Sequence, residues 1–451
     1  MNSGKEPTGS KAWLLRILCY TLISLGYYIF IGTHGNHRIE WLDFHFQRIS
    51  NSVENITVLS PVFRAGLTTF DTPNEVLEQI NHAGSIKVYI VSLLSALPYI
   101  PLFLVGDIKQ ISRAGALMDF TIICITGVLI AEIFINYIIR RERKFNLFYG
   151  VMVFSIFITC PWSYRMIFAA WTEVWWLPLF LASCLLIKEG KIKAGLGLAF
   201  IAGMCNYIWS FWIGIFYFII LLYSRFQSKQ SLGEWALLIP TKNPEMAVNS
   251  KTWFTLSGIS ILPAVCINLH MKVINLLSVP IQHSGSSPLY RIGIDGVANI
   301  HGGGLLAAMQ FLGGNRISTC IDPVKLLPVL PRLTETSSNI FMFNCILSIL
   351  GMAMLSIIAI VGLIYLISKN RNSRWLIAPL SWALLMYATV FQQSFAVHLQ
   401  GHSYIFGMLF ALGITGGLIE TCKNRKLSSI SEVLLGLPIL CGILVSSTRV
   451  V

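Results

Sequence analysis

Long apolar runs alternate with short polar segments along the whole sequence, a pattern typical of a polytopic membrane protein. The first run, residues 12–31, has 20 residues, and a helix of that length covers about 30 Å, the thickness of a bilayer's hydrocarbon core. It is too long for a signal-peptide core and has no small-residue cleavage site, so we expect a retained first span. Hydropathy predicts about eleven transmembrane helices: 12–31, 117–138, 145–160, 174–188, 193–206, 208–223, 252–272, 339–368, 375–391, 403–421 and 429–447.

Clusters of lysine and arginine between these runs predict the orientation of the chain. The strongest clusters are Arg140–Lys144, Lys188–Lys193, Lys369–Arg374 and Lys423–Lys426. Cytoplasmic segments of membrane proteins carry an excess of such residues, so we expect all four clusters and the N-terminus in the cytoplasm. The segments predicted to face outward are then 32–116, 161–173, 273–338 and 392–402. All nine histidines lie in these segments or at their membrane edge, which favours chemistry on the outer face.

The apolar run 86–105 does not fit this alternation. If it crossed the membrane, the Arg140–Lys144 cluster would be outside. It contains Pro98 and Pro101, which interrupt a straight helix. We therefore expect a half-embedded amphipathic helix in the outer leaflet. The alternative is a true span paired with a second span missed elsewhere.

Composition narrows the class of protein further. Hydrophobic residues make up 55% and charged residues 12% of the chain, about half the charged share of soluble proteins. These values exclude a soluble multidomain protein, a disordered chain and a secreted disulfide scaffold. The net charge of +13 lies mainly in the short basic clusters, so it indicates membrane orientation and no nucleic-acid partner. The ten cysteines are scattered and show no zinc-binding pair.

The first outward segment carries the most suggestive group of polar residues. On a helix, Glu40 and Asp43 share one face, and His45 and Arg48 share another. A carboxylate with histidine and arginine nearby suits acid–base chemistry on a phosphorylated substrate. The alternative is an interfacial helix anchored by its aromatic residues, with the charges simply solvated.

The later outward segments hold further candidate residues. Glu173 begins a predicted span, where a carboxylate also stabilises the helix dipole, and Arg165 precedes it. His398 and His402 are four residues apart, a spacing that favours phosphate or hydroxyl contacts over a metal because no third ligand is evident. The remaining candidates are Tyr404, Arg291 in the glycine-rich segment 273–338, and the intramembrane acids Asp119 and Glu132.

Four features together resemble the GT-C superfamily of membrane glycosyltransferases. Asp43-Phe44-His45-Phe46-Gln47-Arg48-Ile49 is similar to the aspartate-led start of that superfamily's first outer loop. Glu173 matches its second acidic position, residues 195–206 its short helical hairpin, and His398–Tyr404 its late loop. The resemblance implies an all-α fold in three parts. These are a catalytic transmembrane module, 1–225, with first outer loop 32–116; a cytoplasmic loop, 226–251; and a C-terminal transmembrane region, 252–451, with outer loop 273–338.

The resemblance also implies an activity. A sugar would pass, with inversion, from a polyprenyl-phosphate donor to a hydroxyl of a glycan, lipid or protein acceptor in the bacterial cell envelope. Asp43 would be the base, and Glu173 would orient the acceptor or the base. The implied substrate-binding residues are Glu40, His45, Arg48, Arg165, Arg291, His398, His402 and Tyr404, with phosphate contacts from Arg48, Arg165, His398 and His402. The superfamily often has an adjacent acidic pair, whereas Asp43 stands alone, so dependence on a divalent cation stays open.

Two other classes of function are compatible with the sequence. A secondary transporter or flippase would bring charged residues such as Asp119 and Glu132 together in the middle of the membrane. A non-enzymatic assembly protein would tolerate replacement of Asp43. Location in the bacterial plasma membrane, with the N-terminus in the cytoplasm, is common to the three hypotheses.

Overall fold

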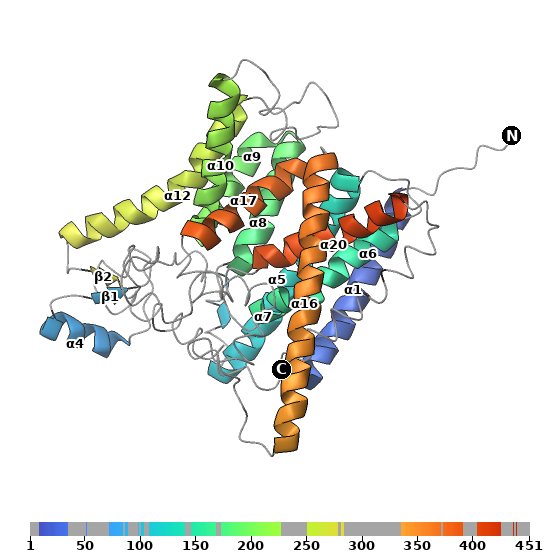
Figure 1. Cartoon of the computed structure of the whole chain (residues 1–451). Coiled ribbons are helices and arrows are strands. Elements are labelled where there is room, and N and C mark those ends of the chain that lie inside the picture. The colour runs from blue at the N-terminus through green and yellow to red at the C-terminus, as the bar shows by residue number, and fades with distance from the viewer. Residues whose placement is uncertain are drawn as a thin grey trace.

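The protein is an almost entirely helical bundle (Figure 1). The computed structural model describes residues 9–34, 51, 72–83, 86–88, 98, 101–102, 108–139, 146–167, 173–226, 250–277, 281–283, 335–370, 373–390, 404–424, 436 and 439. The helices are α1 (Gly9–His34), α4 (Pro73–Ala83), α5 (Ile108–Ile133), the π-helix η3 (Phe134–Ile139), α6 (Asn146–Thr159), α7 (Pro161–Met166), α8 (Glu173–Lys188), α9 (Ile192–Cys205), α10 (Tyr207–Phe226), α12 (Ser250–Leu277), α16 (Glu335–Lys369), α17 (Arg374–Val390) and α20 (Tyr404–Asn424). The strands are β1 (Ile86–Val88) and β2 (Ile281–His283).

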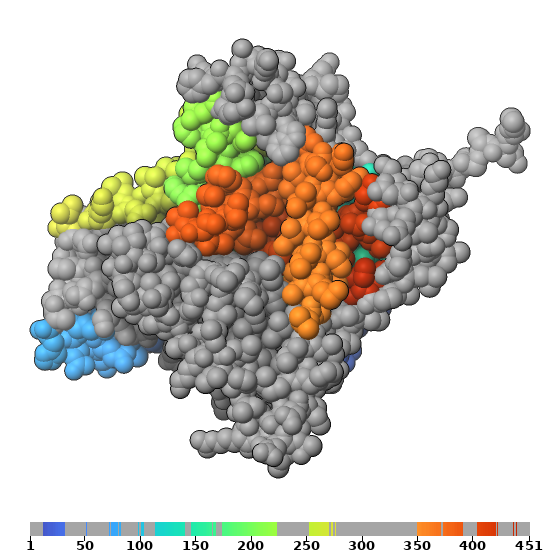
Figure 2. Space-filling model, in the orientation of Figure 1, coloured from blue at the N-terminus to red at the C-terminus, as the bar shows by residue number. Residues whose placement is uncertain are grey.

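Four of the described helices are long and apolar enough to cross a bilayer: Ala12–Ile31, Arg113–Ile139, Thr252–Leu269 and Leu350–Lys369. The side chains that α1 and α16 expose are themselves apolar. They include Leu18, Leu22 and Leu25 on α1, and Ile357 and Val361 on α16, which lies on the surface in the view of Figure 2. Apolar rows of this kind are stable against lipid rather than water. The chain is therefore a membrane protein, as its composition predicts.

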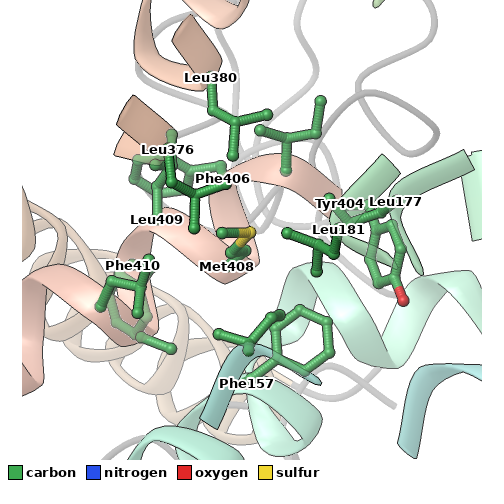
Figure 3. Close-up of a cluster of buried hydrophobic side chains, with 14 of the residues drawn as sticks. Phe157, Leu177, Leu181, Leu376, Leu380, Tyr404, Phe406, Met408, Leu409 and Phe410 are labelled. Carbon is green, nitrogen blue, oxygen red and sulfur yellow. The ribbon is translucent and has the colours of Figure 1, made fainter. Parts of the chain in front are cut away.

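The centre of the bundle is formed by α6 and the helices around it. Tyr149, Val153 and Phe157 of α6 are fully buried. Figure 3 shows Phe157 beside a cluster of leucine, methionine and phenylalanine side chains that come from α8, α17 and α20. Helices from both sides of the 226–251 segment contribute to this core, so the described bundle packs around one hydrophobic centre.

Close backbone packing joins α16 to α20. A Cβ atom added to Gly362 would collide with the carbonyl of Gly413, and one added to Gly413 would collide with the carbonyl of Ala359. Glycine permits this approach because it has no side chain, and small residues are common where membrane helices pack tightly. Leu366 also packs on Gly416, and α20 crosses α16 in Figure 1.

The described residues of clusters 188–193 and 369–374 lie at one end of this bundle, which we call the basic end. Asn370 Nδ2 donates a 2.8 Å hydrogen bond to the Ile138 carbonyl, and the Tyr137 hydroxyl donates a 2.6 Å bond to Glu189 Oε1. These contacts bring together the chain that precedes cluster 140–144 and the two clusters 188–193 and 369–374. Tyr404 at the start of α20 contacts Phe157 near the far end of α6, so residues 423 and 424 at the end of α20 lie toward the basic end. The orientation of the chain across the membrane stays a prediction.

A tight turn joins α8 to α9 at the basic end. Gly190 occupies the left-handed region (φ 82°), which a residue with a side chain rarely adopts. The Ser183 hydroxyl donates a 2.7 Å hydrogen bond to the Gly195 carbonyl, and a Cβ atom on Gly195 would lie 2.9 Å from the Ser183 carbonyl oxygen. The turn therefore fixes α8 against α9 and places Glu189 beside Tyr137.

The structure corrects one sequence prediction. Ile86–Val88 form strand β1, which pairs in parallel with β2, so the helix predicted over 86–105 is wrong at its start. Ile86 and Val88 are β-branched and favour extended backbone when a partner strand is present. Within the rest of the run, Pro98 and the pair Pro101–Leu102 are in 3₁₀ turns. The β1–β2 pair joins the two long segments 32–116 and 273–338, both predicted to face outward.

Helix α4 precedes this strand and carries a capping box at its N-terminus. The Thr72 backbone N–H donates to Glu75 Oε2 at 2.7 Å, and the Thr72 hydroxyl donates to the same oxygen at 2.9 Å. These hydrogen bonds favour the ionised carboxylate and lower the pKa of Glu75. Val76 is buried, which anchors the helix (blue in Figure 1) through its apolar face.

Candidate functional site

Three of the sequence-predicted site residues lie in described helices. Glu173 is the first residue of α8, as predicted, Arg165 lies within α7, and Tyr404 is the first residue of α20. For Glu173 and Arg165 the structure describes the backbone position only. The other predicted site residues lie outside the described residues: Glu40, Asp43, His45, Arg48, Arg291, His398 and His402.

The three described residues lie at the end of the bundle opposite the basic end. Glu173 begins α8, whose other end carries Lys188, and Tyr404 begins α20, whose other end carries the last basic cluster. Helix α7 packs against α20 through an edge-on contact between Trp162 and Phe406, with ring centroids 4.7 Å apart. Arg165, Glu173 and Tyr404 are thus on helix segments that the fold brings to one end.

Polar groups buried among the aromatic side chains distinguish this region, which we call the opposite-end cluster. Its members are Tyr27, Asp119, Cys124, Thr126, Cys160, Ser163, Tyr164 and Tyr404. The side chains of Asp119, Thr126 and Ser163 are fully buried, with exposed fractions of 0%, and Tyr404 is 1% exposed. Burying a carboxylate in a membrane-embedded core is costly, and such groups mark functional sites by default.

Contacts between the members show that this is one cluster. The Cys160 thiol lies 3.1 Å from the Phe157 carbonyl oxygen and 3.3 Å from Ser163 Oγ. A Cβ atom on Gly407 of α20 would lie 3.1 Å from both Cys160 Sγ and Ser163 Oγ, and Asp119 and Cys124 of α5 are near the Tyr404 hydroxyl. In Figure 3 the Tyr404 ring lies at the edge of the apolar group, and its oxygen points away from the labelled leucine and phenylalanine side chains. The Tyr404 hydroxyl therefore faces the polar residues of the cluster and not the apolar group.

Sequence reasoning selected Asp119 and Tyr404 separately but missed Cys160 and Ser163. The signal available was local: the run Cys160-Pro161-Trp162-Ser163-Tyr164-Arg165 places several polar side chains in a short turn between apolar helices. Only the fold brings that turn against α5 and α20. Among the described residues, no group of three or more histidine, cysteine or acidic side chains could hold a metal ion.

The second intramembrane acid lies elsewhere and has a different partner. Glu132 accepts a bidentate ion pair from Arg16, with Nε–Oε1 at 2.7 Å and Nη2–Oε2 at 2.8 Å. It also accepts hydrogen bonds from Tyr20 and Asn136. Thirteen residues separate Asp119 from Glu132 along α5, which is about 20 Å of helix. The two acids do not converge as the transporter hypothesis expects.

No family model matches the chain, and no curated protein or solved structure is significantly similar to it. The resemblance to the GT-C superfamily therefore rests on the sequence motifs alone. The fold and the opposite-end cluster are observed independently of those motifs.

Proposed function

We propose that this protein is an integral membrane glycosyltransferase that uses a polyprenyl-phosphate sugar as donor. The observation that carries the proposal is the meeting of α7 with the start of α20 around the buried polar cluster, at the end opposite the basic end. A lipid-linked donor reaches such a site sideways from the bilayer. The proposal includes the GT-C-like arrangement of about eleven spans, with the basic end and the N-terminus in the cytoplasm.

The proposed reaction is a single displacement at the anomeric carbon. The acceptor hydroxyl gives its proton to Asp43, its oxygen bonds to the sugar, and the bond from the anomeric carbon to the phosphate oxygen breaks. Polyprenyl phosphate leaves with that electron pair, stabilised by cationic and hydrogen-bond donors. We assign phosphate contacts to Arg48, Arg165, His398 and His402. The other assigned substrate contacts are Glu40, His45, Arg291 and Tyr404, with Glu173 as the residue that orients the acceptor or the base.

The separation of the two intramembrane acids favours this function over transport. A carrier needs its charged groups at a common site that can open to either side. Glu132 is instead held by Arg16 near the basic end, whereas Asp119 lies in the opposite-end cluster. Two acids that lie in separate places fit a site that opens on one side.

The test is transfer of radiolabelled sugar from a panel of polyprenyl-phosphate donors by purified protein in lipid vesicles. We expect wild-type turnover with one donor and a loss of about 10²–10⁴-fold in Asp43→Asn, because that substitution removes the proton-accepting charge and keeps the size. Glu78→Gln is the matched control, since Glu78 is an exposed carboxylate on α4 within the same predicted segment. Asp43→Asn turnover above about a tenth of wild type would contradict the assignment of Asp43 as base.

A further inference from the structure

A pocket at the basic end, lined by both polar and apolar side chains, is separate from the opposite-end cluster. It has a volume of about 610 Å³, and α1, η3 and the end of α8 contribute to its lining. The lining residues that matter here are Trp13, Arg16, Glu132, Asn136, Tyr137 and Glu189. A pocket of this size can hold a phospholipid headgroup with part of its glycerol backbone.

Arg16 supplies hydrogen-bond donors to this pocket. A guanidinium has five N–H donors, and the ion pair with Glu132 uses two of them. The Tyr20 hydroxyl is also close to the guanidinium, so at most three N–H groups remain for a ligand. Glu132, in contrast, is saturated by Arg16, Tyr20 and Asn136, so the pair orients the guanidinium and leaves it able to bind a phosphate. Both side chains are mostly buried, with exposed fractions of 12% for Arg16 and 18% for Glu132.

Glu189 supplies an acceptor to the same pocket. Its Oε1 accepts the 2.6 Å hydrogen bond from the Tyr137 hydroxyl, which fixes the carboxylate, while Oε2 remains available. Glu189 is solvent-exposed and follows the last residue of α8. A ligand with a phosphate and a primary ammonium would match the donors of Arg16 and the acceptor of Glu189 together.

The pocket also coincides with a backbone irregularity. Helix α5 widens into the π-helix Phe134–Ile139, and the pocket residues Asn136 and Tyr137 lie within it. π-Helical turns are rare and are often found at functional sites. On the other wall, Trp13 is 48% exposed and continues into the exposed row Leu14, Leu15 and Leu18 of α1. Tryptophan favours the membrane–water boundary, and the leucine row offers a path for acyl chains.

We propose that this pocket binds a phosphatidylethanolamine headgroup, with the phosphate on Arg16 and the ammonium on Glu189. A purely anionic lipid would bind Arg16 through its phosphate, but its headgroup has no cation to pair with the carboxylate of Glu189. A choline lipid keeps both charges but has no N–H group to donate to Glu189. The ethanolamine headgroup therefore matches both walls of the pocket.

The test compares three lipids on the purified full-length protein by native mass spectrometry. We expect phosphatidylethanolamine to be retained about tenfold more strongly than phosphatidylcholine or phosphatidylglycerol. Glu189→Gln should abolish this preference, because glutamine still accepts the Tyr137 hydrogen bond but lacks the charge. Glu78→Gln, an exposed carboxylate of α4, is the matched control and should keep the preference.

Several outcomes would overturn the proposal. Equal retention of all three lipids by the wild-type protein would show non-specific lipid around the bundle. Stronger retention of phosphatidylglycerol would show a simple anion site at Arg16. An ethanolamine preference unchanged in Glu189→Gln would place the lipid elsewhere. The sugar-transfer assay is not involved, so this test is independent of the proposed function.

Discussion

Polar side chains at the two ends of the bundle differ in their exposure and in their partners. At the basic end, the mostly buried side chains of Arg16 and Glu132 form a bidentate ion pair, and Tyr137 bonds to the exposed Glu189. At the opposite end, Asp119 and Ser163 are completely buried beside aromatic rings. Polar groups at the first end link helices to one another or bond to nearby carbonyls, as the buried Arg374 does with Ile367. Those at the second end have a high cost of burial, which a function of that region would explain.

Helix α16 approaches α20 closely at Gly362, near the basic end, and has open space at Gly351, so the packing can be tested within one helix. Gly362→Ala should lower the stability of the protein by about 2 kcal/mol, because the new methyl group collides with the fixed backbone of Gly413. Gly351→Ala in the same helix has open space around its Cβ and should be neutral or stabilising by up to about 1 kcal/mol.

Thermal denaturation of the two variants in lipid nanodiscs, followed by tryptophan fluorescence, checks this difference. Equal midpoints for Gly362→Ala and Gly351→Ala would mean that α16 and α20 do not approach each other as closely as described.

Replacing one tyrosine at each end of the bundle tests whether the two ends have different roles. Tyr404→Phe should reduce sugar transfer by at least about tenfold and leave the denaturation midpoint unchanged, because the hydroxyl is assigned to the substrate. Tyr20→Phe should do the reverse: it removes a 3.3 Å hydrogen bond to Glu132 and should cost about 1 kcal/mol of stability with transfer intact.

Turnover and denaturation measured on the same preparations separate the two roles. A stability loss without a rate loss in Tyr404→Phe would make the opposite-end cluster a packing feature.

The smallest expected effect concerns the N-terminus of α4. The pKa of Glu75 is lowered by its hydrogen bonds from Thr72, so its stabilising contribution is complete above the ordinary pKa of 4.5. The contribution disappears as the pH falls through the lower value of the folded state. Hydrogen exchange of the α4 amides should therefore accelerate only under acidic conditions, and Glu75→Gln should show the faster exchange already at neutral pH. Exchange that is independent of pH in the wild-type protein, after correction for the intrinsic rate, would contradict the capping box.

Hydropathy predicted the helices well because lipid imposes a simple rule. A segment that spans the hydrocarbon core must satisfy its backbone internally, so a long apolar run has few alternatives to a helix. The predicted span 174–188 corresponds to Glu173–Lys188, and 193–206 corresponds to Ile192–Cys205 followed by Asn206. Ten of the eleven predicted spans fall on described helices. The eleventh, 429–447, lies outside the described residues except for 436 and 439.

Long-range pairing could not be predicted in the same way. Strands β1 and β2 have three residues each and lie far apart in the sequence, so neither gives a periodic signal of its own. The meeting of Cys160, Ser163 and Tyr404 likewise depends on how α7 packs against α20. The sequence did not identify Arg16 as the partner of Glu132, because an intramembrane acid indicates that a partner exists but not which residue it is.

The central claim is that Asp43 and Glu173 share one site at the end of the bundle opposite the basic end. An experimental structure of the protein in lipid, resolving the segment that contains Asp43, measures this most directly. We expect the two carboxylates to line one cavity that opens away from the basic end, together with His398 or His402. A separation between the Cα atoms of Asp43 and Glu173 above about 25 Å, close to a whole membrane thickness, would contradict it.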